Sequence, residues 1–121
     1  MPHRVLQRAS LVLLIAIAST PLAADERPLR VATYNVSLFR DEAGQLVRDL
    51  ERGDNDQARR IAEVIQRVRP DILLVNEFDY DAAGRAAMLF RTKYLAVGQN
   101  GCELIEFAHY FTDPVNTGRP S

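Results

Sequence analysis

The stretch that decides the fold is Pro70-Asp71-Ile72-Leu73-Leu74-Val75-Asn76-Glu77, in which four aliphatic residues lead directly into an amide and a carboxylate. An apolar run this short predicts a strand buried on both faces, as in a parallel sheet covered by helices. An unpaired charge at the end of such a strand is costly, so packing alone does not explain Glu77. Because open α/β sheets bind ligands at the carboxyl ends of their strands, Glu77 is the first candidate functional residue.

A second strand is predicted upstream, over residues 29–34. Its residues are mainly β-branched or aromatic and partly alternate with polar ones, which is typical of a strand. This stretch also leads into a polar side chain, the amide of Asn35. The two predicted strands therefore share a pattern, an apolar body with a polar side chain at the carboxyl end.

Two helices are predicted between these strands. The first is short: Leu46, Val47 and Leu50 have helical spacing, and Gly53 follows as a stop. The second ends at Pro70 and has an apolar stripe formed by Ala58, Ile61, Ala62, Ile65 and Val68. Its polar face is predicted to hold Arg59, Arg60, Glu63, Gln66 and Arg67.

The start of the second helix has more than one capping residue. Asp54 or Asn55 can cap it, and Gln57 stands three residues after Asp54, as in a capping box. The order strand, helix, strand then predicts a β-α-β unit with parallel strands.

Parallel strands have their carboxyl ends at the same edge of a sheet, so Asn35 and Glu77 are expected to lie together there. An amide and a carboxylate that converge from separate parts of the chain indicate a site. The alternative is that Asn35 is only a turn former and Glu77 a solvated loop acid. Spacing by itself leaves both interpretations open.

The chain after Glu77 is less regular. A helix is predicted over residues 82–94 with Asp81 as its cap, followed by a loop at 98–101 and an irregular strand at 104–111. Residues 113–121 have the composition of a loop. These elements are too few to flank a buried parallel pair on both sides and both faces. We therefore expect residues 25–121 to be the amino-terminal portion of a larger domain.

The first 24 residues have the order of a secretory signal peptide. Arg4 and Arg8 precede the charge-free apolar run of residues 11–18, and small residues lead to Ala24. The run is shorter than the roughly 20 apolar residues that span a membrane. We expect cleavage after Ala24, no stable membrane anchor, and a periplasmic or extracellular protein.

The charge and cysteine content of the sequence argue against a basic nucleic-acid-binding surface and against an internal disulfide. The chain has 15 basic and 16 acidic residues, and loss of the signal peptide would remove two basic ones and no acid. This balance is not the footprint of a basic nucleic-acid-binding surface. The single cysteine, Cys102, has no partner for an internal disulfide.

The two strand motifs resemble a known family. Residues 29–35 (LRVATYN) followed by residues 69–77 (RPDILLVNE) are similar to the first two motifs of the endonuclease/exonuclease/phosphatase superfamily. This is the fold of deoxyribonuclease-I-like nucleases, inositol polyphosphate phosphatases and secreted sphingomyelinases. Residues 53–55 with the following helix, and Asn116-Thr117-Gly118, resemble a secreted bacterial subgroup, so the resemblance extends from Leu29 to Ser121.

The resemblance implies a four-layer α/β sandwich, of which this chain would form part, beginning with the β-α-β unit. It implies hydrolysis of phosphate esters with a divalent cation, usually Mg²⁺. Glu77 matches the family's metal-binding glutamate, and Asn35 matches an asparagine that positions metal and phosphate. The substrate would be a nucleic acid, nucleotide, phospholipid or inositol phosphate, and fold analogy does not choose among them.

The chain departs from the family in its later motifs. No residue matches the Asp-x-Asn pair, the catalytic histidine or the terminal Asp-His signature, which together supply further metal ligands and the base that activates water. We therefore expect an exported metal-dependent phosphoesterase that is inactive as this chain alone. The alternatives are a non-catalytic exported binding module and a non-functional remnant of the same fold.

Overall fold

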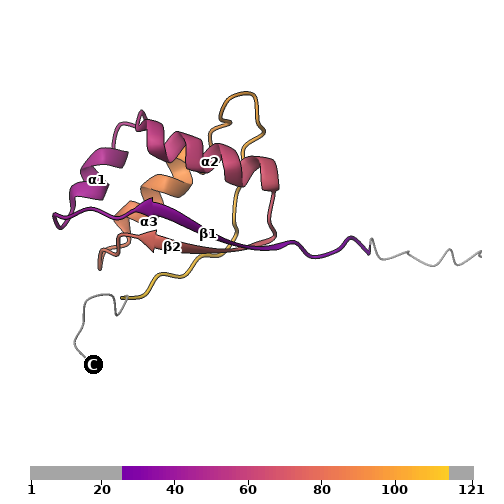
Figure 1. Cartoon of the computed structure of the whole chain (residues 1–121), viewed down its shortest axis with the longest axis horizontal. Coiled ribbons are helices and arrows are strands. Elements are labelled where there is room, and N and C mark those ends of the chain that lie inside the picture. The colour runs from indigo at the N-terminus through magenta and orange to yellow at the C-terminus, as the bar shows by residue number, and fades with distance from the viewer. Residues whose placement is uncertain (1–25, 115–121) are drawn as a thin grey trace, which may run out of the picture.

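The computed structural model describes residues 26–114, which form two strands and four helical segments (Figure 1). The predicted signal peptide, its cleavage site and Asn116-Thr117-Gly118 lie outside the described residues. The elements follow in the order β1 (Val31–Leu38), α1 (Gln45–Leu50), α2 (Asp56–Val68), β2 (Ile72–Phe78), α3 (Arg85–Phe90) and η1 (Arg91–Leu95). The last of these, η1, is a π-helical continuation of α3.

Strands β1 and β2 form a parallel pair, which confirms the predicted β-α-β unit. Val31 lies opposite Ile72, and the register is regular as far as Asn35 opposite Asn76. It then shifts before Leu38 meets Phe78. Strand β1 begins two residues later than predicted and continues past Asn35, so this asparagine lies within the strand at the start of its irregular end.

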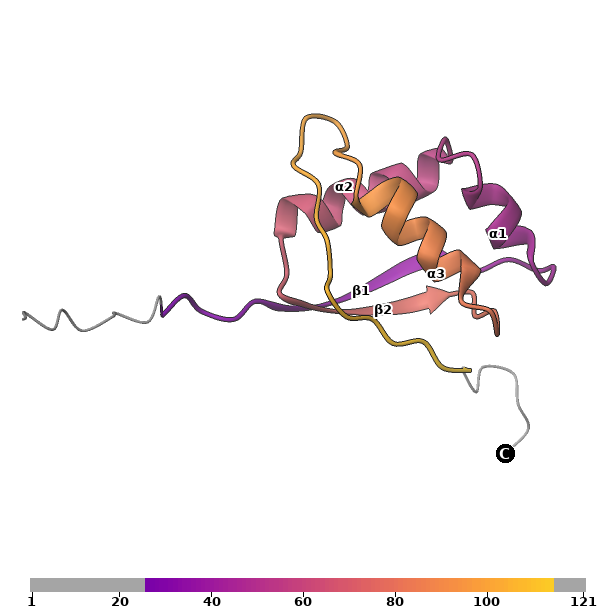
Figure 2. The same ribbon diagram turned by 180° about the vertical axis from the view of Figure 1, so that it is seen from behind.

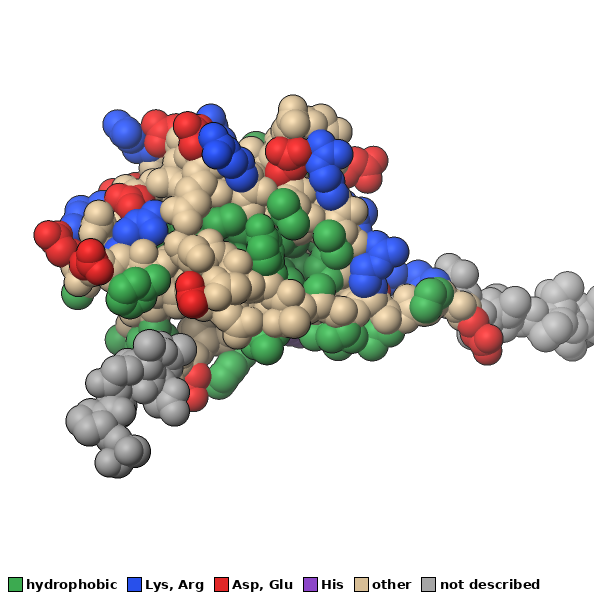
Figure 3. Space-filling model, in the orientation of Figure 1, with side chains coloured by type: hydrophobic (Ala, Val, Ile, Leu, Met, Phe, Trp, Pro, Cys, Tyr) green, Lys and Arg blue, Asp and Glu red, His purple; other side chains and the backbone are tan. Residues whose placement is uncertain are grey.

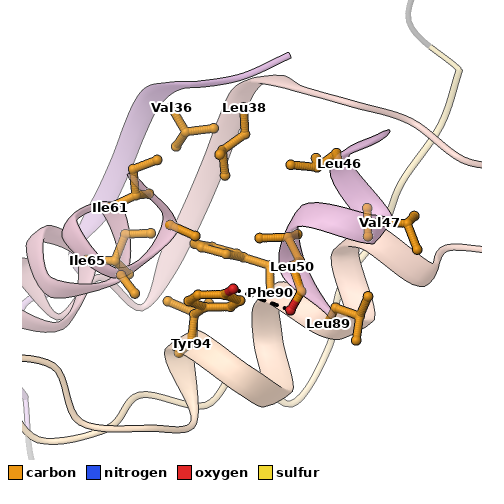
Figure 4. Close-up of a cluster of buried hydrophobic side chains, with 14 of the residues drawn as sticks. Val36, Leu38, Leu46, Val47, Leu50, Ile61, Ile65, Leu89, Phe90 and Tyr94 are labelled. Carbon is orange, nitrogen blue, oxygen red and sulfur yellow. Dashed lines mark hydrogen bonds between the residues drawn. The ribbon is translucent and has the colours of Figure 1, made fainter. Parts of the chain in front are cut away.

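All the helices cover the same face of the strand pair (Figures 1 and 2). They bury a cluster of apolar side chains that the inner positions of the strands complete (Figure 4). The short helix α1 confirms its prediction, because Leu46, Val47 and Leu50 are all buried. In β1 the inward residues at the carboxyl end are Val36 and Leu38, which are also buried. The best-packed end of the sheet is therefore the end that holds Asn35 and Glu77.

The outer face of the strand pair has no cover in residues 26–114, so the prediction of a strand buried on both faces is wrong for this part of the chain. Ile72 is 52% exposed and Leu74 is 62% exposed, and Val31 beside them is similar. Figure 3 shows hydrophobic side chains along the underside of the molecule, below the strands. The alternation of exposed and covered positions follows from the two-residue period of a strand packed on one side.

Helix α2 starts differently from its prediction. Asn55 is the N-cap, and its side chain accepts a hydrogen bond of 2.9 Å from the Ala58 N–H. The predicted capping box between Asp54 and Gln57 is wrong, since the Gln57 side chain bonds to β1 and Arg40 instead. The apolar stripe is confirmed from Ala58 to Ile65, whereas Val68 in the last turn is exposed.

Gln66 was predicted on the polar face of α2, and this prediction is wrong because the side chain is only 2% exposed. Its amide nitrogen donates to the carbonyl oxygens of Leu95 and Val97 at 3.1 and 2.8 Å. Its amide oxygen accepts from the Gln99 N–H at 2.9 Å. A buried glutamine is stable here because both the nitrogen and the oxygen of its amide have backbone partners where η1 ends.

Replacing Gln66 by leucine should lower the free energy of unfolding by about 2 kcal/mol. The substitution fills a similar volume but leaves the buried Gln99 N–H without its partner. It also removes one of the two donors to each of the Leu95 and Val97 carbonyl oxygens, which keep their bonds from Ile105 and Gln99. Urea unfolding of the variant against wild type measures the effect. Val64→Leu, at an exposed position of the same helix, is the control, and equal midpoints for the two variants would contradict the prediction.

After β2 the chain follows the predicted helix and loop but not the predicted strand. The helix begins at Arg85, three residues later than predicted, and its N-cap is Gly84 and not Asp81. The Asp81 carboxylate still accepts from the N–H groups of Arg85 and Ala86 in the first turn, at 2.7 and 2.9 Å. Residues 104–111 were predicted as an irregular strand, and they form none. Arg91 holds this segment instead, with its guanidinium donating to the Phe107 carbonyl and lying 4.0 Å from the centre of the Tyr110 ring.

Candidate metal and phosphate site

The carboxyl ends of β1 and β2 carry the two residues singled out from the sequence. Asn35 lies opposite Asn76, the neighbour of Glu77, and both Asn35 and Glu77 are exposed. The chain leaves the regular ladder at this point in both strands. Ser37 has a φ of 48° and Glu77 a φ of 55°, in the left-handed region that non-glycine residues seldom occupy. Strained backbone of this kind concentrates at functional sites.

Ser37 brings the two predicted residues together. Its N–H donates to Asn35 Oδ1 at 3.1 Å, and its Oγ lies 3.3 Å from the same oxygen. The Ser37 Oγ also lies 3.4 Å from Glu77 Oε2. Asn35 and Glu77 therefore meet around one hydroxyl group, although they are far apart in the sequence. The structure thus brings both side chains to one edge, and the bond from the Ser37 N–H is also the contact that a turn-forming asparagine makes.

Sequence reasoning missed Ser37. The signal that could have found it is the Asn35-Val36-Ser37 order, because an asparagine side chain commonly accepts a hydrogen bond from the backbone two residues further on. The contact with Glu77 has no such local signal. It depends on the register of two strands separated by the whole of α1 and α2.

A chain of polar contacts connects the carboxyl end of β1 to helices α1 and α2. Gln57, in the first turn of α2, donates from Nε2 to the Ser37 carbonyl oxygen at 2.8 Å. Its Oε1 accepts from Arg40 Nη2 at 3.1 Å, and Arg40 in turn pairs with Asp49 of α1 at 2.7 Å. The position of Ser37 is thus set by β1, α1 and α2 together.

The next carboxylate along the chain, Asp79, does not join the site. Its Oδ2 accepts from the Arg40 N–H at 3.0 Å. Burial raises the pKa of Asp79 above its ordinary value, while the Arg40 N–H and guanidinium charge act in the opposite direction. Asp79 therefore fastens the end of β2 to the end of β1, and Glu77 is the carboxylate that points to Ser37.

The oxygen atoms at this edge could supply some of the ligands of a hard divalent cation. Glu77 offers carboxylate oxygens and Asn35 an amide oxygen, which are ligand types that Mg²⁺ accepts alongside several retained waters and substrate phosphates. Within residues 26–114 no group of three or more His, Cys, Asp or Glu residues is placed to hold a metal ion. These residues thus fit part of a magnesium site and leave the remaining positions to water, substrate or other ligands.

The chain is similar to a known protein family over most of its length. The model of the Endonuclease/Exonuclease/phosphatase family matches residues 32–120. The chain belongs to this family. Asn35 and Glu77 both lie within the residues that match this family. Membership of the Endonuclease/Exonuclease/phosphatase family supports a function of the phosphoesterase or nuclease type.

No curated protein and no solved structure matches the chain. Among the helices of residues 26–114, none is both long enough and apolar enough to cross a membrane. Cys102 is a free thiol, in agreement with its being the single cysteine of the sequence.

Proposed function

We propose that this chain supplies the cation- and phosphate-binding edge of an exported, metal-dependent phosphoesterase. The observation that carries the proposal is the convergence of Asn35 and Glu77 around the Ser37 hydroxyl, at the carboxyl edge of a parallel strand pair. A ligand site at this edge is what the topology favours. The family match supplies the reaction class, the cleavage of phosphate esters.

In this proposal Glu77 and Asn35 hold Mg²⁺ through their side-chain oxygens. The cation, when bound, would polarise a phosphoryl oxygen and stabilise charge on the leaving oxygen. Glu77 contributes the negative charge that attracts the cation to this edge. The Asn35 amide has two kinds of atom to offer, since its oxygen can face the cation while its nitrogen donates to a phosphate oxygen.

We also propose that these residues alone do not complete a turnover. Hydrolysis needs a group that takes a proton from the attacking water, and such a base must lie within hydrogen-bonding reach of it. Glu77 is committed to the cation, Asp79 is bonded to Arg40, and His109 lies in the segment after η1 that Arg91 holds at Phe107. The residues described here would therefore bind a cation weakly and leave phosphate esters intact.

The finer fold proposal is a deoxyribonuclease-I-like four-layer α/β sandwich. Its support is the exposed apolar face formed by Val31, Ile72 and Leu74, which a second sheet would cover. One polar pair on this face is already satisfied, because Asn76 donates to Thr33 Oγ1 at 3.0 Å. Export, to the periplasm or beyond the cell, rests on the signal-peptide order of residues 1–24.

Binding of Mn²⁺ to the purified chain tests the proposal. Mn²⁺ takes the same oxygen ligands as Mg²⁺ and can be followed by electron paramagnetic resonance. We expect weak, saturable binding that Mg²⁺ displaces, and no hydrolysis of bis(p-nitrophenyl) phosphate above the rate in buffer. Absence of binding would overturn the metal site, and metal-dependent hydrolysis that persists through purification would overturn the proposed inactivity.

A further inference from the structure

Ser37 has a strained backbone that packing does not explain. The residue is exposed, yet its φ of 48° places it in a region where a side chain costs free energy. Glycine would occupy this position without that cost. Its backbone is held on both sides, by the Asn35 side chain at the N–H and by Gln57 at the carbonyl oxygen. The conformation is therefore fixed by polar contacts, and the hydroxyl group is the part that a glycine could not replace.

The hydroxyl group has two acceptors and one proton. Asn35 Oδ1 and an ionised Glu77 Oε2 can only accept, so Ser37 must be the donor to each of them. The distances of 3.3 and 3.4 Å are both longer than the roughly 2.8 Å of a typical O–H···O bond. Such lengths are expected where one proton is shared between two oxygens.

We propose that Ser37 is a positioning residue for the divalent-cation site, an inference that rests on the proposed function. It draws the Asn35 amide oxygen and the Glu77 carboxylate, which come from different strands, toward one point. With a cation held by Asn35 Oδ1 and by the second oxygen of Glu77, the Ser37 proton would bond Glu77 Oε2 and hold that carboxylate in place. Partners that orient metal ligands in this way are commonly worth about 10–100-fold in metal affinity.

Two substitutions separate this role from a purely structural one. Ser37→Gly removes the hydroxyl and relieves the backbone strain, so the melting temperature should stay the same or rise while Mn²⁺ binds roughly tenfold more weakly. Ser37→Thr keeps the hydroxyl but places a β-branched residue at a positive φ. It should lower the melting temperature and bind Mn²⁺ nearly as well as wild type.

The experiment measures Mn²⁺ affinity by electron paramagnetic resonance and melting temperature by circular dichroism on the full chain and both variants. The proposal is supported if Ser37→Gly has the higher melting temperature of the two variants and Ser37→Thr the higher Mn²⁺ affinity. If wild type binds Mn²⁺ but Ser37→Gly binds it equally well, Ser37 has no positioning role and the metal site stands. If wild type itself fails to bind Mn²⁺, the proposed function falls and the role of Ser37 falls with it.

Discussion

Replacing Glu77 by glutamine should weaken Mn²⁺ binding by at least roughly a hundredfold. Loss of a residue that only hydrogen-bonds to a metal ligand already lowers metal affinity by about 10–100-fold, and Glu77 is proposed to be a ligand itself. Glutamine keeps the shape and the polar atoms of the side chain but removes the charge. In the described part of the chain no three His, Cys, Asp or Glu residues are grouped to hold a metal ion. The next carboxylate along the chain, Asp79, is bonded to the Arg40 N–H. Titration of the variant with Mn²⁺ by electron paramagnetic resonance measures the loss.

The same substitution should leave the fold intact. Glu77 is exposed and its φ of 55° is equally unfavourable for glutamate and glutamine, so the backbone strain does not change. Surface substitutions of this kind usually change stability by less than about 0.5 kcal/mol. A thermal melt that matches wild type would therefore assign the lost affinity to the site and not to unfolding.

Glu103→Gln is the matched control for Glu77→Gln. It removes the same charge from another exposed glutamate, in the segment that follows η1. It should leave Mn²⁺ affinity unchanged within about twofold, since exposed charges separated by more than about 10 Å are largely screened by salt. Equal losses in the two variants would show that net charge attracts the cation and that Glu77 is not its ligand.

Strong local patterns allowed much of this fold to be predicted from the sequence. Two local signals predict their elements without knowledge of what packs against them. They are the aliphatic run before Asn76 and the apolar stripe of α2, which Pro70 follows. Both elements are found where expected, and their order alone predicts parallel strands. The convergence of Asn35 and Glu77 then follows from topology, because parallel strands end at the same edge.

The predictions that failed depend on contacts between distant parts of the chain. Gln66 looks like a surface residue, and its burial is understood only when the carbonyl groups at the end of η1 are placed beside it. Residues 104–111 have strand composition, but they pair with neither β1 nor β2 and are held by Arg91 instead. Ser37 was missed for the same reason, since Glu77 reaches it only through the pairing of β1 with β2.

The largest effect on stability is expected at Tyr94, the largest side chain that is fully buried. Its ring is stacked on Phe90 with centroids 6.0 Å apart, and its hydroxyl group donates to the Leu50 carbonyl oxygen at 3.3 Å (Figure 4). The same hydroxyl accepts from the N–H of Asn55, the N-cap of α2, also at 3.3 Å. One side chain thus joins the end of α1, the start of α2 and η1.

Tyr94→Ala should cost about 3–5 kcal/mol, the usual cost of removing a buried aromatic ring and leaving a cavity. Tyr94→Phe keeps the ring but leaves the Asn55 N–H without its partner, while the Leu50 carbonyl oxygen keeps its bond from the Gly53 N–H. An unpaired N–H of this kind should cost about 1–3 kcal/mol. Urea unfolding followed by circular dichroism gives both values. Phe111→Ala is the control, because that ring is 86% exposed and its loss should be nearly neutral.

Tyr94→Phe also tests whether the packing of the core supports the metal and phosphate site. Asn55 caps the helix turn that carries Gln57, and Gln57 holds the Ser37 carbonyl oxygen. If this connection matters, Tyr94→Phe should weaken Mn²⁺ binding by a few-fold under conditions where the chain is still folded, whereas Gln66→Leu, which loosens the far end of the same helix, should not. Equal affinities for Tyr94→Phe and wild type would mean that β1 holds Ser37 in place without the help of α2.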